Sequence, residues 1–245
     1  MSGEIRILHG SVFSDIIDGL HDVITQLTPT PFALVGGVAV LVHVPGHRVT
    51  EDIDGAVRGH VNDIRDRLLV VAQRAKQRSS TVVMANGIPV DVLADGYGPI
   101  RRGLGRRTSK AFAVRWAIET AAAMTVDAVP TSSRGPVTLP VARPSALIAM
   151  KAVSMADPQR GDKRATDMLD LWRLLSDDPI ASAAILEELR SAPEDLRTWV
   201  TTQLASLFDD DPAGFLSQMA AGIGTAQTVD EIRELWEAVI EPNLG

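Results

Sequence analysis

Hydrophobic residues in the first part of the chain follow two spacings, one typical of helices and one typical of strands. Between Asp15 and Leu27 the apolar residues recur every three or four positions, which predicts an amphipathic helix. Short apolar runs bounded by glycine or proline predict strands, and Asn86-Gly87 predicts a two-residue hairpin turn. These patterns predict helices at 15–27, 38–43 and 62–76, strands at 32–35 and 52–57, and a hairpin of strands 81–85 and 88–93.

Beyond residue 95 the pattern changes twice. A stretch rich in glycine and arginine predicts an exposed loop as far as Lys110, followed by two or three short strands up to Val141. Pro144 suits the first turn of a helix, and only helical spacing follows it. The predicted helices are 144–155, 165–175, 180–191, 193–208 and 228–240. This order indicates an α+β fold with an αβ domain over residues 1–142 and a helical domain over residues 143–245.

Composition then limits the chemistry. The chain contains no cysteine, which rules out disulfides, Fe–S clusters, cysteine-based zinc sites and a thiol nucleophile. His43 and His47 have the spacing of zinc ligands on a helix, but Pro45 and Gly46 between them break the helix. No stretch is apolar enough for a membrane span, and the N-terminus lacks the apolar core of a signal peptide. We therefore expect a cytoplasmic protein.

The net charge of −7 is unevenly distributed along the chain. Residues 177–245 contain 14 acidic and 3 basic residues, whereas residues 1–176 contain 17 acidic and 21 basic residues. The segment from Gly96 to Ile118 carries six bases and no acid. A basic loop over residues 101–110 is either a solvated loop or a contact for an RNA backbone, and the sequence supports both interpretations equally.

Two short motifs in the first domain suit a charged ligand. Gly36-Gly37 lies between a predicted strand and a predicted helix, where glycine allows close approach and the helix N-terminus offers N–H groups to a phosphate. Asp52 and Asp54 lie two apart in a predicted strand, so their side chains share a face and suit a hard cation. Each motif alone is more often a tight turn or a solvated pair of acids.

Asp91 interrupts the otherwise apolar predicted strand that ends at Leu93. Burying an unpaired carboxylate is costly, and metal binding or a salt bridge would offset the cost. The plainer alternative is a half-exposed strand with Asp91 facing water. Beside Asp52 and Asp54, Asp91 would complete a two-metal site for phosphoryl transfer.

Lys151 is the only charged residue in its predicted helix, and it shares an apolar face with Leu147 and Ile148. A lysine there must extend to water, form an ion pair or contact a ligand such as a phosphate. On the next predicted helix, Asp167 and Asp170 lie three positions apart. Either of them is a candidate partner of Lys151, a ligand-binding residue or a solvated acid.

Taken in order, these motifs resemble those of the nucleotidyltransferase superfamily. The motifs are Leu34-Val-Gly-Gly37, Arg48-Val-Thr-Glu-Asp-Ile-Asp54, Pro89-Val-Asp91, Lys151 and Asp167-Met-Leu-Asp-Leu171. The Arg-x-Thr that precedes Asp-x-Asp and the later lysine and aspartates are similar to the AbiEii-type subgroup. That subgroup includes type IV toxins and the MenT tRNA nucleotidyltransferases of mycobacteria. The resemblance covers about residues 32–176.

The resemblance implies a role for each of these residues, and a nucleotidyltransferase-like mixed sheet as the fold of the first domain. Asp52, Asp54 and Asp91 would hold two Mg²⁺ ions, and Asp91 would also activate the attacking hydroxyl. The residues implied in catalysis are Asp52, Asp54, Asp91 and Lys151. The residues implied in nucleotide binding are Gly36, Gly37, Thr50, Lys151 and Asp167. One departure is Val38, where the family often has a serine or threonine.

The expected function is a Mg²⁺-dependent nucleotidyltransferase that moves a nucleoside monophosphate from an NTP to an acceptor hydroxyl and releases pyrophosphate. The acceptor would be a tRNA 3′ end or a protein, and the subgroup implies a toxin with a cognate antitoxin. One alternative is a small-molecule nucleotidyltransferase of the aminoglycoside type, for which the acidic C-terminal region is suited. The other is a non-catalytic nucleotide-binding module, against which the three intact aspartates argue.

Overall fold

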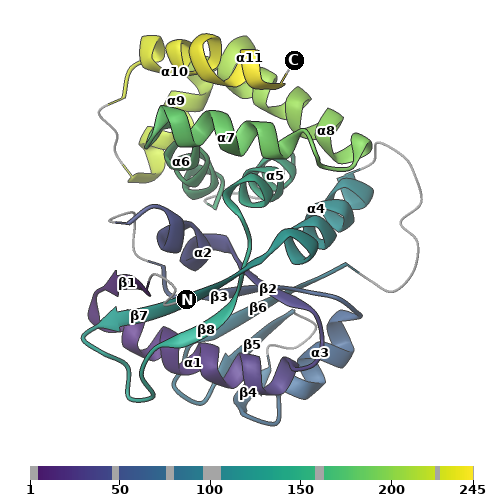
Figure 1. Ribbon diagram of the computed structural model, residues 1–245, viewed down its shortest axis with the longest axis vertical. Helices are drawn as coiled ribbons and strands as arrows, with labels where there is room; N and C mark the ends of the chain where they lie inside the picture. Colours follow the sequence, from purple (N-terminus) through teal and green to yellow (C-terminus); the bar gives the residue numbers. More distant parts are fainter. Residues whose placement is uncertain are drawn as a thin grey trace. The chain divides into compact units, whose positions relative to one another are not determined.

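The computed structural model describes residues 5–45, 50–75, 80–95, 106–157, 163–223 and 227–244. The chain divides into two compact units. The sheet unit comprises Met1–Pro99 and Val114–Arg143, and the helical unit comprises Ile100–Ala113 and Pro144–Gly245. The α+β class expected from the sequence, a mixed sheet with helices followed by a helical region, is confirmed (Figure 1).

The sheet unit contains a mixed sheet with eight strands among the described residues. The strands are β1 (Ile5–His9), β2 (Phe32–Val35), β3 (Ile53–Val57), β4 (Ala72–Ala75), β5 (Thr81–Met84), β6 (Pro89–Ala94), β7 (Ala122–Val129) and β8 (Val137–Val141). Their spatial order is β1-β7-β8-β2-β3-β6-β5-β4. The pairs β1/β7, β2/β8 and β3/β6 are parallel, and the remaining pairs are antiparallel. The two strands with the candidate aspartates, β3 and β6, are therefore interior neighbours.

Helices lie on both faces of this sheet (Figure 1). Helix α1 (Ser11–Leu27) lies on one face and helix α2 (Gly36–His43) on the other. In α1, Gly19 packs closely against Ile53 of β3. A Cβ added to this glycine would lie only 3.1 Å from Ile53 Cδ1. Successive side chains of a strand point to opposite faces, so Asp54 points away from α1.

The predicted helix over residues 62–76 is wrong in its second half. Helix α3 (Val61–Leu68) ends at Leu68, and the chain turns into the edge strand β4. Val71 N donates to Leu68 O at 3.1 Å, the tighter hydrogen bond that often closes a helix. Val70 is 77% exposed, so the apolar spacing beyond Leu68 does not form a helix face. Val70 and Val71 lie in the turn that follows α3, and the chain becomes extended at Ala72, where β4 pairs with β5.

Helix α4 (Arg106–Thr120) replaces the predicted end of a loop and the start of a strand. Its buried Ala113 and Ala117 recur at helical spacing. Arg115 Nε also donates at 3.0 Å to the carboxylate of buried Asp95, which fixes the helix to the end of β6. A long-range ion pair of this kind leaves no local pattern. Strand β1 and, in the helical unit, helices α9 and α11 were not predicted either.

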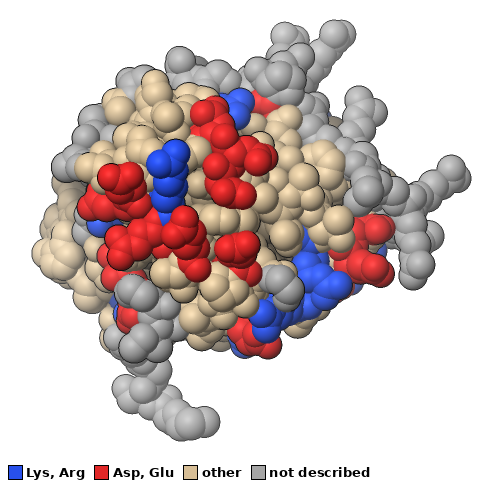
Figure 2. Space-filling model, turned by 90° about the horizontal axis from the view of Figure 1, so that it is seen from above, with Lys and Arg blue, Asp and Glu red and all other residues tan. Residues whose placement is uncertain are grey.

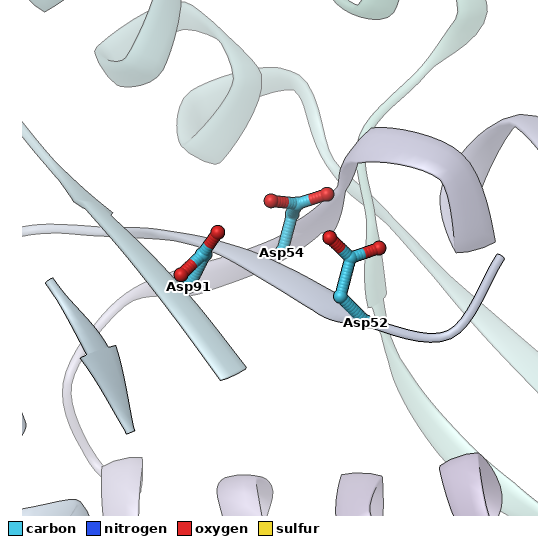
Figure 3. A group of neighbouring side chains, drawn as sticks. All are labelled: Asp52, Asp54 and Asp91. Carbon is cyan, nitrogen blue, oxygen red and sulfur yellow. The ribbon is translucent and has the colours of Figure 1, made fainter. Parts of the chain in front are cut away.

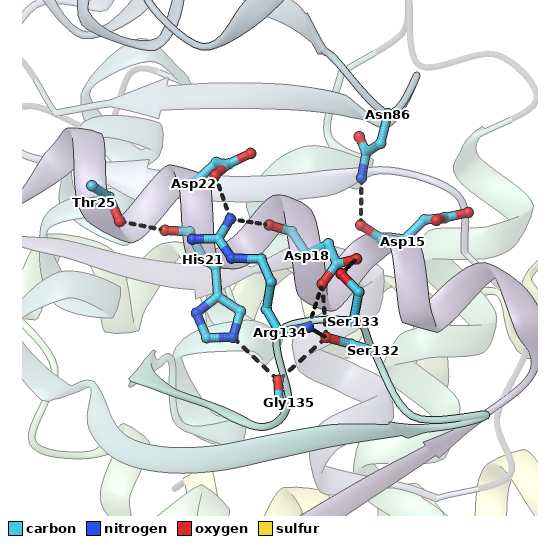
Figure 4. Close-up of polar contacts among 10 residues, drawn as sticks. All are labelled: Asp15, Asp18, His21, Asp22, Thr25, Asn86, Ser132, Ser133, Arg134 and Gly135. Carbon is cyan, nitrogen blue, oxygen red and sulfur yellow. Dashed lines mark hydrogen bonds and ion pairs between the residues drawn. The ribbon is translucent and has the colours of Figure 1, made fainter.

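A polar network holds the loop between β7 and β8 against α1 (Figure 4). Asp18 accepts hydrogen bonds from Ser132 Oγ and Ser133 Oγ, both at 2.8 Å, and from Arg134 N at 3.2 Å. Burial raises the pKa of Asp18, but these hydrogen bonds outweigh it and hold the pKa below its ordinary value. The ionised carboxylate therefore stabilises this loop.

The helical unit packs short helices around an apolar core. They are α5 (Pro144–Met155), α6 (Lys163–Ser176), α7 (Pro179–Leu189), α8 (Glu194–Ala205), the π-helical η1 (Ser206–Asp210), α9 (Pro212–Ile223), α10 (Val229–Leu235), the π-helical η2 (Trp236–Ile240) and α11 (Glu241–Leu244). Phe208 and Phe215 pack in the core with ring centroids 4.7 Å apart. Acidic side chains gather on the face that Figure 2 shows.

Candidate active site

Three carboxylates converge on the sheet face opposite α1 (Figure 3). Asp54 of β3 and Asp91 of β6 are register partners across the parallel pair, so their side chains project side by side. Asp52 precedes β3 by one residue and turns its carboxylate to the same place. One oxygen from each of the three aspartates lies within 4.8 Å of the others. The structure thus brings together the three residues that the sequence analysis predicts as metal ligands.

The electrostatics of this cluster favour a cation. All three carboxylates are half-buried, and like charges at this distance repel one another. Oxygen donors from several carboxylates are the ligands that hard divalent cations such as Mg²⁺ prefer. The donor set therefore fits a divalent metal, and carboxylates that bridge two ions are typical of two-metal sites.

Gly36 lies directly against the cluster. Its φ of 67° is in the left-handed region, which glycine adopts without strain. A Cβ at this position would lie 1.9 Å from Asp54 Oδ2, so no larger residue fits without moving the carboxylate. Gly36 and Gly37 form the first turn of α2, and the start of this helix is thereby next to Asp54. A phosphate that bound at this helix N-terminus would lie beside the metal ligands.

Thr50 is a buried neighbour of the first aspartate. Its Oγ1 donates a hydrogen bond to Asp52 Oδ1 at 2.7 Å. The structure therefore shows the hydroxyl oriented towards a candidate metal ligand, and the predicted phosphate contact of Thr50 stays a prediction. Arg48, which contributes to the same motif, lies outside the described residues.

Thr81 is a neighbour of the cluster that the sequence prediction missed. Its Oγ1 donates a hydrogen bond to Asp91 Oδ1, and the two residues are register partners of β5 and β6. The predicted two-residue turn would have paired Asp91 with Val82. Instead Met84 N donates to Ile88 O, and the loop is one residue longer. A turn of this length shifts the register by one residue, and that shift places Thr81 beside Asp91.

Lys151 of α5 forms a buried cluster with two aspartates of α6. Its Nζ donates to Asp167 Oδ1 at 2.7 Å and also to Asp170 Oδ2. Burial lowers the pKa of Lys151, but the negative charges of Asp170 and Asp167 outweigh it and raise the pKa above its ordinary value. Ser154 Oγ donates to Asp167 Oδ2 at 3.2 Å. The expected pairing of Lys151 thus involves both aspartates, and its contact with a phosphate stays a prediction.

The remaining candidate residues from the sequence are the basic segment and two histidines. Most of the basic segment 101–110 lies outside the described side chains, and its contact with RNA stays a prediction. Arg115, the last base of the longer segment from Gly96 to Ile118, forms an ion pair with Asp95 at 3.0 Å. His43 is part-buried with Nε2 2.9 Å from a backbone carbonyl, and burial lowers its pKa, whereas His47 is outside the described residues. None of the described helices has the length and apolar character of a membrane span.

A mixed sheet that presents three clustered aspartates beside a glycine turn is the arrangement implied by the nucleotidyltransferase resemblance, and one solved structure agrees at the level of the fold. The crystal structure of an antigenic nucleotidyltransferase-like protein from Paracoccidioides brasiliensis matches with a TM-score of 0.50 and 18% identity, over 89% of this chain and 97% of that chain. JHP933 from Helicobacter pylori matches with a TM-score of 0.46 and 13% identity, over 95% of this chain and 92% of that chain. The likeness to the Paracoccidioides brasiliensis protein shows that the fold is nucleotidyltransferase-like.

The family follows from the sequence comparison. A family model described as the nucleotidyl transferase AbiEii toxin of a type IV toxin–antitoxin system matches residues 22–242. The chain belongs to this family and is a nucleotidyltransferase. No curated protein matches the chain.

Proposed function

We propose that the chain transfers a nucleoside monophosphate from an NTP to an acceptor hydroxyl, with Asp52, Asp54 and Asp91 holding two Mg²⁺ ions. The observation that carries this proposal is the convergence of three carboxylate oxygens within 4.8 Å on one sheet face. In the reaction a bond forms between the acceptor oxygen and the α-phosphorus of the NTP. The bond between the α-phosphorus and the bridging oxygen breaks, and pyrophosphate leaves with that oxygen.

The chain's own residues supply positioning and one proton acceptor. When bound, the two divalent ions would neutralise the triphosphate and stabilise the attacking and leaving oxygens. The Asp91 carboxylate, which lies at the end of the cluster away from Asp52 (Figure 3), would accept the proton of the acceptor hydroxyl, the role that the family resemblance implies for it. Gly36 and Gly37 leave the backbone of α2 open to the phosphates. Most of the rate enhancement then comes from orientation and charge neutralisation.

Lys151 and Asp167 belong to this proposal as nucleotide-binding residues. An ammonium has three N–H donors, and Asp167 and Asp170 use two of them. The raised pKa keeps the group charged, which suits a contact with a triphosphate oxygen. Lys151→Ala should weaken NTP binding and slow transfer, and Lys151→Arg should restore only part of both, because a planar guanidinium does not replace a compact ammonium.

The acceptor that we propose is a tRNA 3′ end or a protein hydroxyl, in keeping with the toxin family. The same family suggests a cognate antitoxin. The second candidate is a cationic small molecule of the aminoglycoside type, which the acidic face of the helical unit favours (Figure 2). Residues 177–245 carry 14 acids and 3 bases, and such a surface attracts cations and repels an RNA backbone.

One experiment tests the reaction and separates these acceptors. The full chain is incubated with Mg²⁺ and each of the four α-³²P-labelled NTPs, together with bulk tRNA, total protein or an aminoglycoside. Label should appear on one acceptor class with the wild type and not with Asp54→Asn, which loses a metal ligand. Binding of Mg²⁺ and NTP without transfer to any acceptor would favour the non-catalytic module. A wild type that neither binds nor transfers would refute the proposal.

A further inference from the structure

Thr81 is the first residue of β5, and its hydroxyl faces the aspartate cluster. The residue is 8% exposed and opposes Asp91 in the antiparallel pair of β5 and β6. Of the side chains that the structure describes, Thr81 is the one that donates a hydrogen bond to Asp91. A buried hydroxyl that is directed at a candidate metal ligand requires a physical explanation.

The strand pairing brings these two side chains close together. Val92 N donates to Ser80 O at 3.2 Å, which makes Thr81 and Asp91 a non-hydrogen-bonded pair of the antiparallel ladder. Side chains in such pairs lie closer than those in hydrogen-bonded pairs. Threonine is also stiff about χ1, so the strand fixes the position of its hydroxyl. The backbone of β5 therefore determines the position of the Thr81 hydroxyl that donates to Asp91 Oδ1.

We propose that Thr81 is a positioning residue of the metal site, whose hydroxyl holds the Asp91 carboxylate in the orientation that directs it towards Asp54. This inference rests on the proposed function, because it concerns the cations of the same site. A carboxylate free to rotate about χ1 and χ2 must lose that freedom when it binds a cation, and a ligand that is already oriented loses less. Partners that orient metal ligands commonly contribute to metal affinity in this way.

The arrangement at the other end of the cluster is similar. Thr50 Oγ1 donates to Asp52 Oδ1 at 2.7 Å, so each outer aspartate accepts from one buried threonine. The central residue, Asp54, is instead confined by its close approach to Gly36. All three ligands are thereby restricted before a cation arrives.

Three variants distinguish positioning from a merely structural role. Thr81→Val removes the hydroxyl and keeps the shape, whereas Thr81→Ser keeps the hydroxyl and removes the methyl group. Thr125→Val is the matched control, because Thr125 Oγ1 lies 2.9 Å from Thr138 Oγ1 in a cross-strand pair of β7 and β8. Strand β2 separates this pair from β3. A structural role would lower the melting temperature in Thr81→Val without changing the affinity for metal.

The measurement is Mn²⁺ binding to the full chain, followed by electron paramagnetic resonance of the free ion. We expect the Mn²⁺ Kd of Thr81→Val to rise at least about tenfold, as for other residues that orient metal ligands, while Thr81→Ser and Thr125→Val stay within about threefold of the wild type. In the transfer assay the Mg²⁺ concentration for half-maximal rate should rise by the same factor. The KM for NTP at saturating Mg²⁺ should not change.

Several outcomes would overturn the role of Thr81. Wild-type Mn²⁺ affinity in Thr81→Val would do so. A loss in Thr81→Ser as large as that in Thr81→Val would also do so, because Thr81→Ser keeps the hydroxyl and should keep the affinity. If Thr81→Val does not fold, Thr81→Ala against Thr81→Ser provides the same comparison. A wild type that binds Mn²⁺ no better than Asp54→Asn would refute the proposed function as well. Tight wild-type binding together with an unaffected Thr81→Val would refute the role of Thr81 alone.

Discussion

Replacing Gly36 with alanine perturbs both the backbone and the carboxylate that lies against it. A Cβ at this position would lie 1.9 Å from Asp54 Oδ2 and 2.5 Å from Asp54 Cγ. To restore an ordinary contact of about 3.4 Å, the carboxylate or the start of α2 must move by about 1.5 Å, because neighbours in a packed structure cannot overlap. The variant therefore displaces a proposed metal ligand.

Two effects of different size should result. A non-glycine residue at φ 67° costs roughly 1–2 kcal/mol of folding free energy. A displacement of reacting groups by about 1 Å costs on the order of 10²-fold in rate. We therefore expect Gly36→Ala to lose about 1–2 kcal/mol in urea unfolding and at least about 100-fold in the rate of labelled nucleotide transfer.

Gly135 provides the matched control. Its φ is 72°, and a Cβ there would meet nothing within 4 Å. Gly135→Ala should lose a similar folding free energy, about 1–2 kcal/mol, while its transfer rate stays at the wild-type level. If Gly36→Ala transferred nucleotide as fast as Gly135→Ala, the close approach of Gly36 to Asp54 would not matter for the reaction, and the reasoning would be wrong.

Three further predictions concern charged groups. Asp54→Asn should abolish transfer and leave the melting temperature of the metal-free protein unchanged or raised, because it relieves repulsion among clustered carboxylates; a sharp fall would indicate a structural ion pair. Lys151→Met should lower the unfolding free energy in urea by about 3–5 kcal/mol, because it removes the cation that donates to buried Asp167 and Asp170, and a loss under about 1 kcal/mol would contradict this. Hydrogen bonds lower the pKa of folded Asp18 below 3.8, so its contribution to stability is present above that pH and is lost as the pH falls through the folded pKa. Melting curves of Asp18→Asn between about pH 5 and pH 2 should lack this loss, and parallel profiles for variant and wild type would refute it.

Local sequence patterns carried the prediction of the elements next to the site. The apolar run at 32–35, the glycines after it and the alternation around Asp54 are properties of neighbouring residues, and β2, α2 and β3 lie where these patterns place them. The face shared by Asp52 and Asp54 also follows from spacing alone. These features needed no knowledge of distant contacts.

The position of Asp91 beside Asp54 could not be predicted from spacing. It depends on the parallel pairing of β3 with β6, and α3, β4 and β5 intervene between these strands in the chain. Only the order of motifs in a known superfamily implied it. The hydrogen bond from Thr81 was missed for a related reason, since one extra residue in a hairpin loop decides which residue opposes Asp91.

The misassigned helices show the same limit. The apolar spacing from Ile64 onward fits a helix as far as residue 76, whereas the chain turns over residues 69–71 and becomes extended from Ala72, where it pairs with β5. Helix α4 follows a stretch rich in glycine and arginine, which is typical of a loop. The ion pair of its Arg115 is with Asp95, which lies 20 positions earlier in the chain. Tertiary partners overrode local propensity in both segments.

The placement of β3 and β6 in the middle of the sheet has a consequence for how the site responds to solvent. Amide groups of interior strands exchange their hydrogens with water only through large openings of a domain, whereas those of edges and termini exchange through local fraying. Asp54 and Asp91 are carried by strands with a neighbour on both sides, β2 and β5 respectively completing the ladder. Their backbone therefore belongs to the slowly exchanging part of the protein, and cations entering the cluster meet a scaffold that does not have to fold around them.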